Sequence, residues 1–302
     1  MFFATDALVL VLRAITFVAL FQAAGAALFL AFYHRDIAAE SETRIRNAAR
    51  VAALVALCAA VGEYVLTPAR MAGDFGSTFD PSLESLLLRS NSGSAHIVRV
   101  VGLAVLLLSL DQATQLYRWA ATGGAGLSLL SFVLMGHTVI HAQRWLLAPL
   151  LLLHVVVGAA WLGALLGLYV VARDAPQPRC GALVARFSAQ AIRLVPLIFV
   201  CGAVMSVLFI AGWSELATGY GAMVIGKVLG FGLLMALAAR NKWRFGPQLL
   251  ADVPGAAEGL RRTIAVEWVV IALILVATAV MTSLFAPEHI EGVFAPGHDL
   301  DH

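Results

Sequence analysis

Long runs of apolar residues, separated by short polar connections, make up most of the chain. Eight runs have about the 20 residues that an α-helix needs to cross a hydrocarbon core of roughly 30 Å. They are continuously apolar instead of alternating, and an open sheet edge cannot be satisfied in lipid, so membrane strands are excluded. The pattern predicts spanning helices over 7–32, 47–66, 95–112, 119–139, 148–172, 190–213, 221–240 and 263–285.

Composition supports this interpretation. The chain is 61% hydrophobic and only 13% charged, with a mean hydropathy of +0.89, too apolar for a soluble domain. We therefore predict an all-α, polytopic transmembrane bundle of about eight helices, forming a single membrane domain over 1–302. The first segment, "MFFATDALVLVLR", lacks a basic stretch before its apolar run, so we expect a retained helix instead of a cleaved signal.

The basic residues predict the orientation of the helices. Of the 20 Lys and Arg, 14 lie in the connections near 33–50, 113–119, 173–193 and 240–262, which identifies these as cytoplasmic. An even number of helices then places both termini outside, in the periplasm of a bacterial inner membrane. The long connection 67–94 is external, and we expect a short amphipathic helix over 81–89.

Most histidines fall on the predicted outer half of the bundle. His96 begins the third span, and "MGHTVIH" places His137 and His141 four residues apart at the end of the fourth. These two share a face if the helix continues that far, although a wetted helix end is the simpler interpretation. His154 lies inside the otherwise apolar "APLLLLHVVVGAAWLG". A titratable group there is costly and is expected to face the bundle interior with a partner.

Sulfur-bearing side chains lie on the same half of the membrane. Met135 and Met281 are near outer helix ends, and "CGAVM" places Cys201 and Met205 on one face of the sixth span. Thioethers and thiolates favour Cu(I), and imidazole also suits copper. Outer histidines followed by deeper sulfur could therefore relay a copper ion, although methionine is also a common filler of cores.

Four ionisable residues lie within or at the ends of spans: Arg13, Glu63, Lys227 and Glu267. Interhelical pairing that fixes the bundle is one explanation, and proton or ion passage is the other. Glu63 and Lys227 are both expected near the outer side, where they could pair with each other.

Several function classes lack their motifs. The chain has no phosphate-binding glycine loop, no H-E-x-x-H, no G-x-S-x-G and no nucleic-acid patch, so we expect neither an enzyme of these classes nor a nucleic-acid partner. Gly163/Gly167 and Gly226/Gly230 have G-x-x-x-G spacing, which we interpret as close helix packing.

The second half of the chain resembles the bacterial copper resistance protein D family (CopD, PcoD and YebZ). The matching segments occur in order, from "GH" at 136–137 and "LHVVVGAAWLGALL" at 153–166 to "RFS" at 186–188, "TGYGAMVIGKVL" at 218–229, "ARNKWRFGPQL" at 239–249 and "VEW" at 266–268. The resemblance covers roughly 136–287, between the looser N-terminal helices 1–135 and an external tail 288–302.

The resemblance implies an eight-helix inner-membrane protein that handles copper, as Cu(I) or Cu(II), and moves it from periplasm to cytoplasm. The family motifs fall on His137, His154, Trp161, Lys227, Asn241 and Glu267, without a role assigned to each. His141, Cys201 and Met205 are outside these motifs and are candidates from residue chemistry alone.

Three functions are consistent with these observations. The leading hypothesis is a copper permease, not an enzyme, whose site includes His137 and His154, one from each of two consecutive helices. A membrane b-type haem protein with axial histidines is the second. The third is a non-transporting scaffold or sensor that docks a periplasmic copper chaperone on the 67–94 connection.

Overall fold

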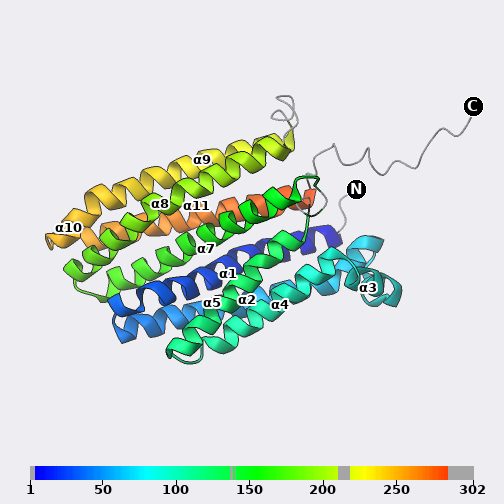
Figure 1. Ribbon diagram of the computed structural model, residues 1–302, viewed down its shortest axis with the longest axis horizontal. Helices are drawn as coiled ribbons and strands as arrows, with labels where there is room; N and C mark the ends of the chain where they lie inside the picture. Colours follow the sequence, from blue (N-terminus) through cyan, green and yellow to red (C-terminus); the bar gives the residue numbers. More distant parts are fainter. Residues whose placement is uncertain (1–3, 137–138, 140, 210–217, 285–302) are drawn as a thin grey trace, which may run out of the picture.

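The computed structural model describes residues 4–136, 139, 141–209 and 218–284. It is an elongated bundle of long helices lying side by side (Figure 1). In the first half, α1 (Ala4–Tyr33) is followed by α2 (Ala39–Ala72), α3 (Pro81–Leu88), α4 (Asn91–Ser109) and α5 (Gln115–Leu130). In the second half, α7 (Arg144–Asp174) is followed by α8 (Gln177–Phe209), α9 (Gly219–Arg240), α10 (Gly246–Leu250) and α11 (Ala256–Leu284).

Seven helices in the described ranges are long and apolar enough to cross a membrane. The predicted fourth span is the exception, because α5 has only 16 residues and continues as a 3-10 turn, Ser131–Leu134. Every other predicted span corresponds to one of the seven. The all-α, multi-pass membrane fold is therefore confirmed, with α5 as the short eighth member of the bundle.

Two helix boundaries differ most from the predicted ranges. The fourth span was expected to reach residue 139, but the backbone becomes extended at Met135 and Gly136 has a φ of +76°, a left-handed conformation that an α-helix cannot contain. The sixth span was expected to begin near 190, but α8 begins at Gln177. The first turns of α8 carry arginines, so this part of the helix lies outside the apolar run from which the span was predicted.

The predicted external connection contains the expected short helix. α3 begins at Asp80, whose carboxylate accepts hydrogen bonds from the backbone N–H groups of Ser82 and Leu83, as an N-cap does. The hydroxyl of Ser82 also donates to this carboxylate at 2.6 Å, and this bond, together with the two backbone bonds, lowers the pKa of Asp80. Pro81 follows at the first helical position, where its missing N–H costs nothing.

The two halves meet where α1 crosses α7. A side-chain carbon added at Gly25 would lie 1.8 Å from the carbonyl oxygen of Ala159, and one added at Gly163 would lie 1.8 Å from the backbone of Gly25. Only glycine permits backbones to approach this closely, so the packing interpretation of Gly163 is confirmed. Gly226 differs, since nothing lies within 4 Å of a carbon added there.

The described ends of the chain, Ala4 and Leu284, lie at the same end of the bundle, beside α3, whereas α10 lies at the opposite end (Figure 1). We call these the α3 end and the α10 end. This arrangement agrees with an even number of crossings. That the α3 end faces the periplasm stays a prediction.

Candidate copper site

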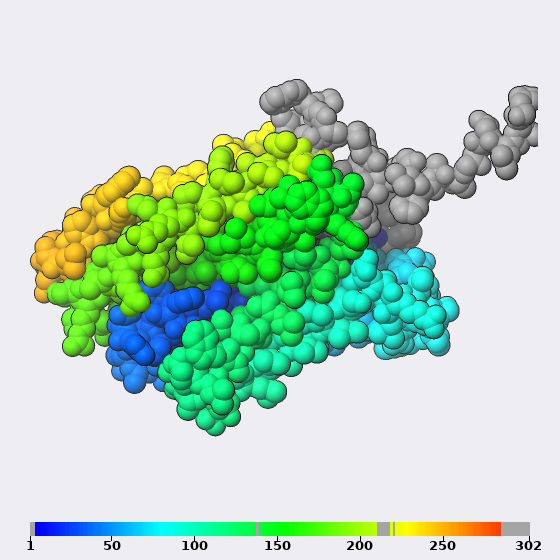
Figure 2. Space-filling view, in the orientation of Figure 1, coloured from blue at the N-terminus to red at the C-terminus, as the bar shows by residue number. Residues whose placement is uncertain are grey.

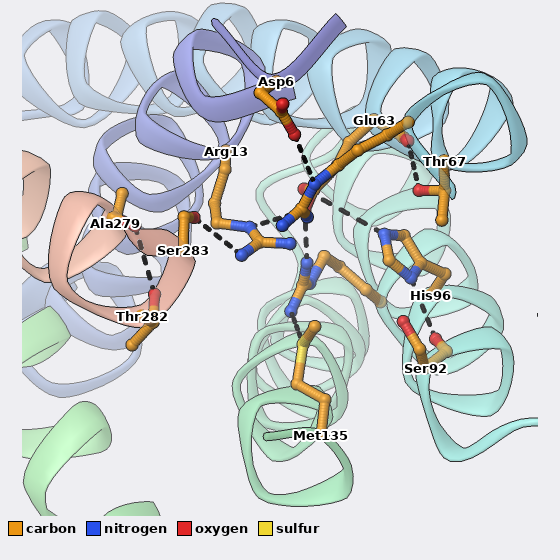
Figure 3. A network of polar contacts seen from close by, with 12 residues as sticks. Asp6, Arg13, Glu63, Thr67, Ser92, His96, Met135, Ala279, Thr282 and Ser283 are labelled. Carbon is orange, nitrogen blue, oxygen red and sulfur yellow. Dashed lines mark hydrogen bonds and ion pairs between the residues drawn. The ribbon is translucent and has the colours of Figure 1, made fainter. Parts of the chain in front are cut away.

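A group of buried charges lies between α1, α2 and α4 near the α3 end. We call Arg13, Glu63, His96 and Arg99 the Glu63 cluster. Glu63 Oε1 accepts a hydrogen bond from Arg13 Nε at 2.8 Å, while Glu63 Oε2 lies 4.0 Å from His96 Nε2 and 3.9 Å from Arg99 Nη1. Figure 3 shows Arg13 and His96 approaching Glu63 from two sides. The cluster joins the first three spans of the chain.

Arg99 is the largest fully buried side chain of the described structure, with 0% exposure. Its Nε donates to Ser131 Oγ at 3.0 Å, its Nη2 donates to Met135 Sδ at 3.2 Å, and its guanidinium lies 4.9 Å from the centre of the Phe132 ring. Arg99 therefore ties α4 to the turn after α5. The sulfur of Met135, a predicted copper ligand, is occupied by this contact.

The orientation of His96 fixes which of its nitrogens is free. Its Nδ1 lies 2.8 Å from the carbonyl oxygen of Ser92, which can only accept, so Nδ1 carries the proton and Nε2 presents a lone pair. Glu63 Oε2, His96 Nε2 and Arg99 Nη1 are all buried and have no hydrogen-bond partner among the described residues. Two acceptors and one donor thus converge on the same point.

The charge balance of the Glu63 cluster disfavours a copper ion. Arg13 and Arg99 bring two permanent positive charges against the single carboxylate of Glu63. A third positive charge in a low-dielectric interior would be repelled strongly. The cluster is better suited to fixing α1, α2 and α4 than to accepting a cation.

A second group lies in the other half of the bundle, on α7, α8, α9 and α11. We call His154, Cys201, Met205, Lys227 and Met281 the His154 cluster. His154 Nδ1 lies 3.1 Å from the carbonyl oxygen of Ile198 on α8, so Nδ1 is the protonated nitrogen and Nε2 presents a lone pair. Metal-binding histidines are oriented in this way, with the other ring N–H held by a carbonyl.

The same histidine packs directly on α8. A carbon added at Gly202 would lie 3.5 Å from His154 Cε1, so the ring of His154 lies against the turn that runs from Ile198 to Gly202. Cys201, which is buried and has a free thiol, belongs to this turn, and Met205 is one turn further along. Cys201 was expected to lie deeper than the histidines, but it lies at the level of His154.

Lys227 and Met281 form the α9–α11 side of the cluster. The ammonium of Lys227 donates to Met281 Sδ at 3.4 Å and is close enough for its charge to act on His154. The expected pair between Lys227 and Glu63 is not formed, because Glu63 is paired with Arg13 and the ammonium lies on a sulfur. Which residues pair therefore depends on which helices lie side by side, and not only on the depth of each residue within its span.

Three predicted residues nearer the α10 end form a separate polar group, which we call the latch: Trp161, Asn241 and Glu267. The side-chain amide of Asn241 donates to the carboxyl of Glu267, and the Trp161 side chain lies close enough to this carboxyl to interact with it. Asn241 begins a π-helical turn, Asn241–Phe245, that follows α9. Such turns are rare and recur at functional sites. Three family-motif residues from α7, the π-helical turn and α11 therefore meet.

The remaining predicted ligands are not brought together by the described structure. His137 lies outside the described residues, so its pairing with His154 stays a prediction. His141 follows the end of α5 at a bend, where its Nδ1 accepts from the N–H of Gln143 at 3.1 Å and its ring meets Phe209. Because His137 lies outside the described residues, the i, i+4 pair of His137 with His141 also stays a prediction.

Counted over the described ranges, no three His, Cys, Asp or Glu side chains come together as a metal site. A copper site there must rely on thioethers in addition, which suits Cu(I). The two histidines within described spans also belong to separate clusters, the buried His96 beside Glu63 and the half-buried His154 beside Ile198. The described histidines therefore do not form the facing pair that a b-type haem requires.

An open hollow of about 350 Å³ lies near the α3 end, between α4, the turn after α5 and the start of α7. Its described lining is mostly apolar, and it includes Arg144 and Trp145. It lies outside both the Glu63 and the His154 cluster. The hollow lies beside the segment that contains the predicted ligand His137.

The sequence analysis missed Arg99. The signal was present, since "HIVRVVGLAVLLL" places an arginine three residues after His96 inside an apolar run. An arginine in a spanning helix is a candidate for an internal partner by default, and the i, i+3 spacing puts both side chains on one face.

Comparison with known proteins agrees with this architecture. Residues 4–143 match the copper resistance protein D-like N-terminal domain, and residues 181–281 match copper resistance protein D. The chain is also 25% identical over 294 residues to the copper transport protein CutJ of Bacillus subtilis (strain 168), covering 91% of this chain and 52% of that relative. The chain thus spans about half the length of this curated relative.

No solved structure matches the chain. The two matches include all four members of the Glu63 cluster and Cys201, Met205, Lys227 and Met281 of the other cluster, whereas His154 lies between the two matched ranges. The resemblance drawn from the short motifs of the second half is thereby extended to the first. The chain belongs to the copper resistance protein D family.

Proposed function

We propose that this protein carries copper across the membrane, from the periplasm toward the cytoplasm, and that the His154 cluster holds the ion on its way. The family membership and the name of the relative CutJ support copper as the cargo. The main support for the site is the orientation of His154. Its Nδ1 is held by the carbonyl of Ile198, so the lone pair of Nε2 remains available to a metal ion beside the turn that contains Cys201.

The donor set of the cluster suits a cation that is passed on. One imidazole with the thiol of Cys201 and the thioether of Met281 forms a soft, low-coordinate set, which selects Cu(I) over hard cations. A transport site must bind its ion well enough to accept it and weakly enough to release it. A set with few charged ligands meets that requirement better than a closed cage of thiolates.

The chain works as a carrier in this proposal and not as an enzyme. It has no nucleotide-binding motif, so the driving force is the membrane potential or a handover between copper-binding proteins. A potential of 100 mV contributes about 2.3 kcal/mol per charge moved fully across. A periplasmic copper chaperone that docks on the 67–94 connection would supply the ion at the α3 end.

Uptake of Cu(I) into sealed vesicles that contain the purified protein tests the proposal. We expect uptake by the wild type, its loss in His154→Ala, and normal uptake in His34→Ala, a matched control at the far end of α1. An imposed inside-negative potential of 100 mV should raise the equilibrium accumulation by about fiftyfold for one charge. Equal uptake by wild type and His154→Ala would contradict the proposed site, and no uptake by the wild type would contradict transport.

A further inference from the structure

Two predicted thioether ligands accept hydrogen bonds from cationic side chains of the protein itself. Met135 Sδ accepts from Arg99 Nη2 at 3.2 Å, and Met281 Sδ accepts from Lys227 Nζ at 3.4 Å. A thioether is only a weak acceptor. In both places a positive group therefore lies where a soft ligand would meet a copper ion.

The two cations are held very differently. Arg99 has several other partners, namely Ser131, the Phe132 ring and the carboxylate of Glu63, and its side chain is fully buried. Its removal from Met135 would break a connected network. The thioether of Met135 is therefore not accessible to an incoming ion.

Lys227 has no such network. Within the described ranges its ammonium has the thioether of Met281 as its hydrogen-bond partner, and no Asp or Glu lies within ion-pairing distance. A charge within a spanning helix that has no described counter-ion is costly and marks a functional position inside a membrane. Lysine is also a compact point charge on a flexible stem, which can leave a weak partner easily.

The helix that carries Lys227 is the least buried of the spans. Only 6% of the apolar window of α9 is buried inside the bundle, compared with 72% for α7. Figure 2 shows α8 on one flank of the bundle, next to α7. α8 and α9 meet through the stacked rings of Phe199 and Phe231. Few contacts therefore oppose a change in the position of Lys227.

We propose that the ammonium of Lys227 is a tethered cation that occupies the Met281 end of the copper site and competes with the ion for it. This inference rests on the proposed function. An arriving copper ion displaces the ammonium from Met281, and the positive charge that stays nearby weakens binding and favours release. Lys227 is thus a positioning residue that sets how tightly the His154 cluster holds copper.

The affinity for Cu(I) tests this role directly. We would measure it in detergent by competition with a coloured Cu(I) chelator, for the wild type, Lys227→Gln, Lys227→Arg and Lys242→Gln. Removal of one nearby charge should tighten binding by about tenfold or more, so Lys227→Gln should gain affinity. Lys227→Arg keeps the charge, and Lys242→Gln removes the chain's other lysine beyond the far end of α9, so both should stay close to the wild type.

A second pair of variants separates competition from a structural role. Met281→Leu in the Lys227→Gln background should abolish the gain in affinity, because the released thioether is then missing. In vesicles, Lys227→Gln should take up copper more slowly although it binds more tightly. Unchanged or weaker binding by Lys227→Gln, or a gain that survives Met281→Leu, would overturn the inference.

The outcome is distinguishable from failure of the proposed function. Wild-type protein that neither binds nor carries Cu(I) contradicts the proposed function itself. Wild-type binding that is lost in His154→Ala but unchanged in Lys227→Gln supports the site and contradicts only the role of Lys227.

Discussion

The Glu63 cluster and the His154 cluster contain similar residues but differ in how their charges are balanced. Each has a histidine with Nδ1 held by a backbone carbonyl and a methionine contacted by a cation. The Glu63 cluster adds a buried carboxylate that pairs with Arg13, whereas Lys227 has no described carboxylate partner. We infer that the clusters differ in how firmly the cation is held, since Arg99 has a counter-ion and further partners whereas Lys227 has a single weak thioether partner in the described structure.

The packing around the clusters differs in the same direction. The α1–α7 and α4–α5 contacts are backbone to backbone, at Gly25 with Gly163 and at Gly102 with Gly124. In contrast, the spans that surround the His154 cluster on its outer side, α8 and α9, are only 17% and 6% buried. The first half is thus a fixed support, and the second half leaves α9 more freedom to move relative to it.

Removal of the counter-ion should have the largest effect on stability. Glu63→Leu leaves the guanidiniums of Arg13 and Arg99 without their shared counter-ion and should destabilise the protein by about 3–5 kcal/mol. Lys227→Leu, which removes an uncompensated charge, should leave stability unchanged or raise it. Unfolding in mixed micelles with increasing denaturing detergent measures both, and equal losses in the two variants would remove the distinction between the clusters.

Substitution of the crossing glycine should come next. Gly163→Val places methyl groups into the backbone of α1, where even a Cβ would lie 1.8 Å from Gly25, and should cost about 3 kcal/mol or more by overpacking. Gly226→Val is the control, because that position faces open space. If both substitutions had the same small effect on the detergent unfolding transition, the contrast in packing between the halves would be wrong.

Loss of the latch near the α10 end should cost less. Asn241→Leu removes the donor to the buried carboxyl of Glu267 and should destabilise by about 1–3 kcal/mol, the cost of leaving a buried acceptor unsatisfied. Asn241→Gln keeps the amide and should recover part of the loss. This effect, measured by the same unfolding transition, would show that the second half has a structural carboxylate of its own. No loss in Asn241→Leu would indicate that the latch contributes nothing.

The fold was largely predictable because hydrophobic runs report directly on membrane crossing. The boundaries were less so, since the first turns of α8 carry Arg179 and Arg186 and are helical outside any apolar run. The end of α5 depended on the left-handed Gly136, which a hydropathy pattern does not reveal. The short helix α3, in contrast, was expected from the amphipathic pattern over 81–89, within one residue of its observed end.

The residues of the candidate site could be named from the sequence, but the contacts between them could not. His154, Lys227 and Met281 were all named from residue chemistry, and the structure places them on neighbouring helices. The pairing of Glu63 with Arg13 instead of Lys227 depends on the lateral order of helices and on their rotation. The position of a residue within its span gives its depth in the membrane, but a single sequence gives neither the lateral order of the helices nor their rotation.

The smallest expected effect concerns the methionine of the Glu63 cluster and tests the comparison where the two clusters look most alike. Met135→Leu conserves volume in a packed position and should cost less than about 1.5 kcal/mol. Because Arg99 already occupies its sulfur, the affinity for Cu(I) should stay within about twofold of the wild type, a difference of under 0.5 kcal/mol at about 1.4 kcal/mol per tenfold. Met281→Leu removes a thioether whose described hydrogen-bond partner is Lys227. It should weaken binding several-fold in the same chelator competition. A loss of affinity in Met135→Leu as large as in Met281→Leu would mean that copper reaches the Glu63 cluster in spite of its two guanidiniums, and that its charge balance does not exclude the ion.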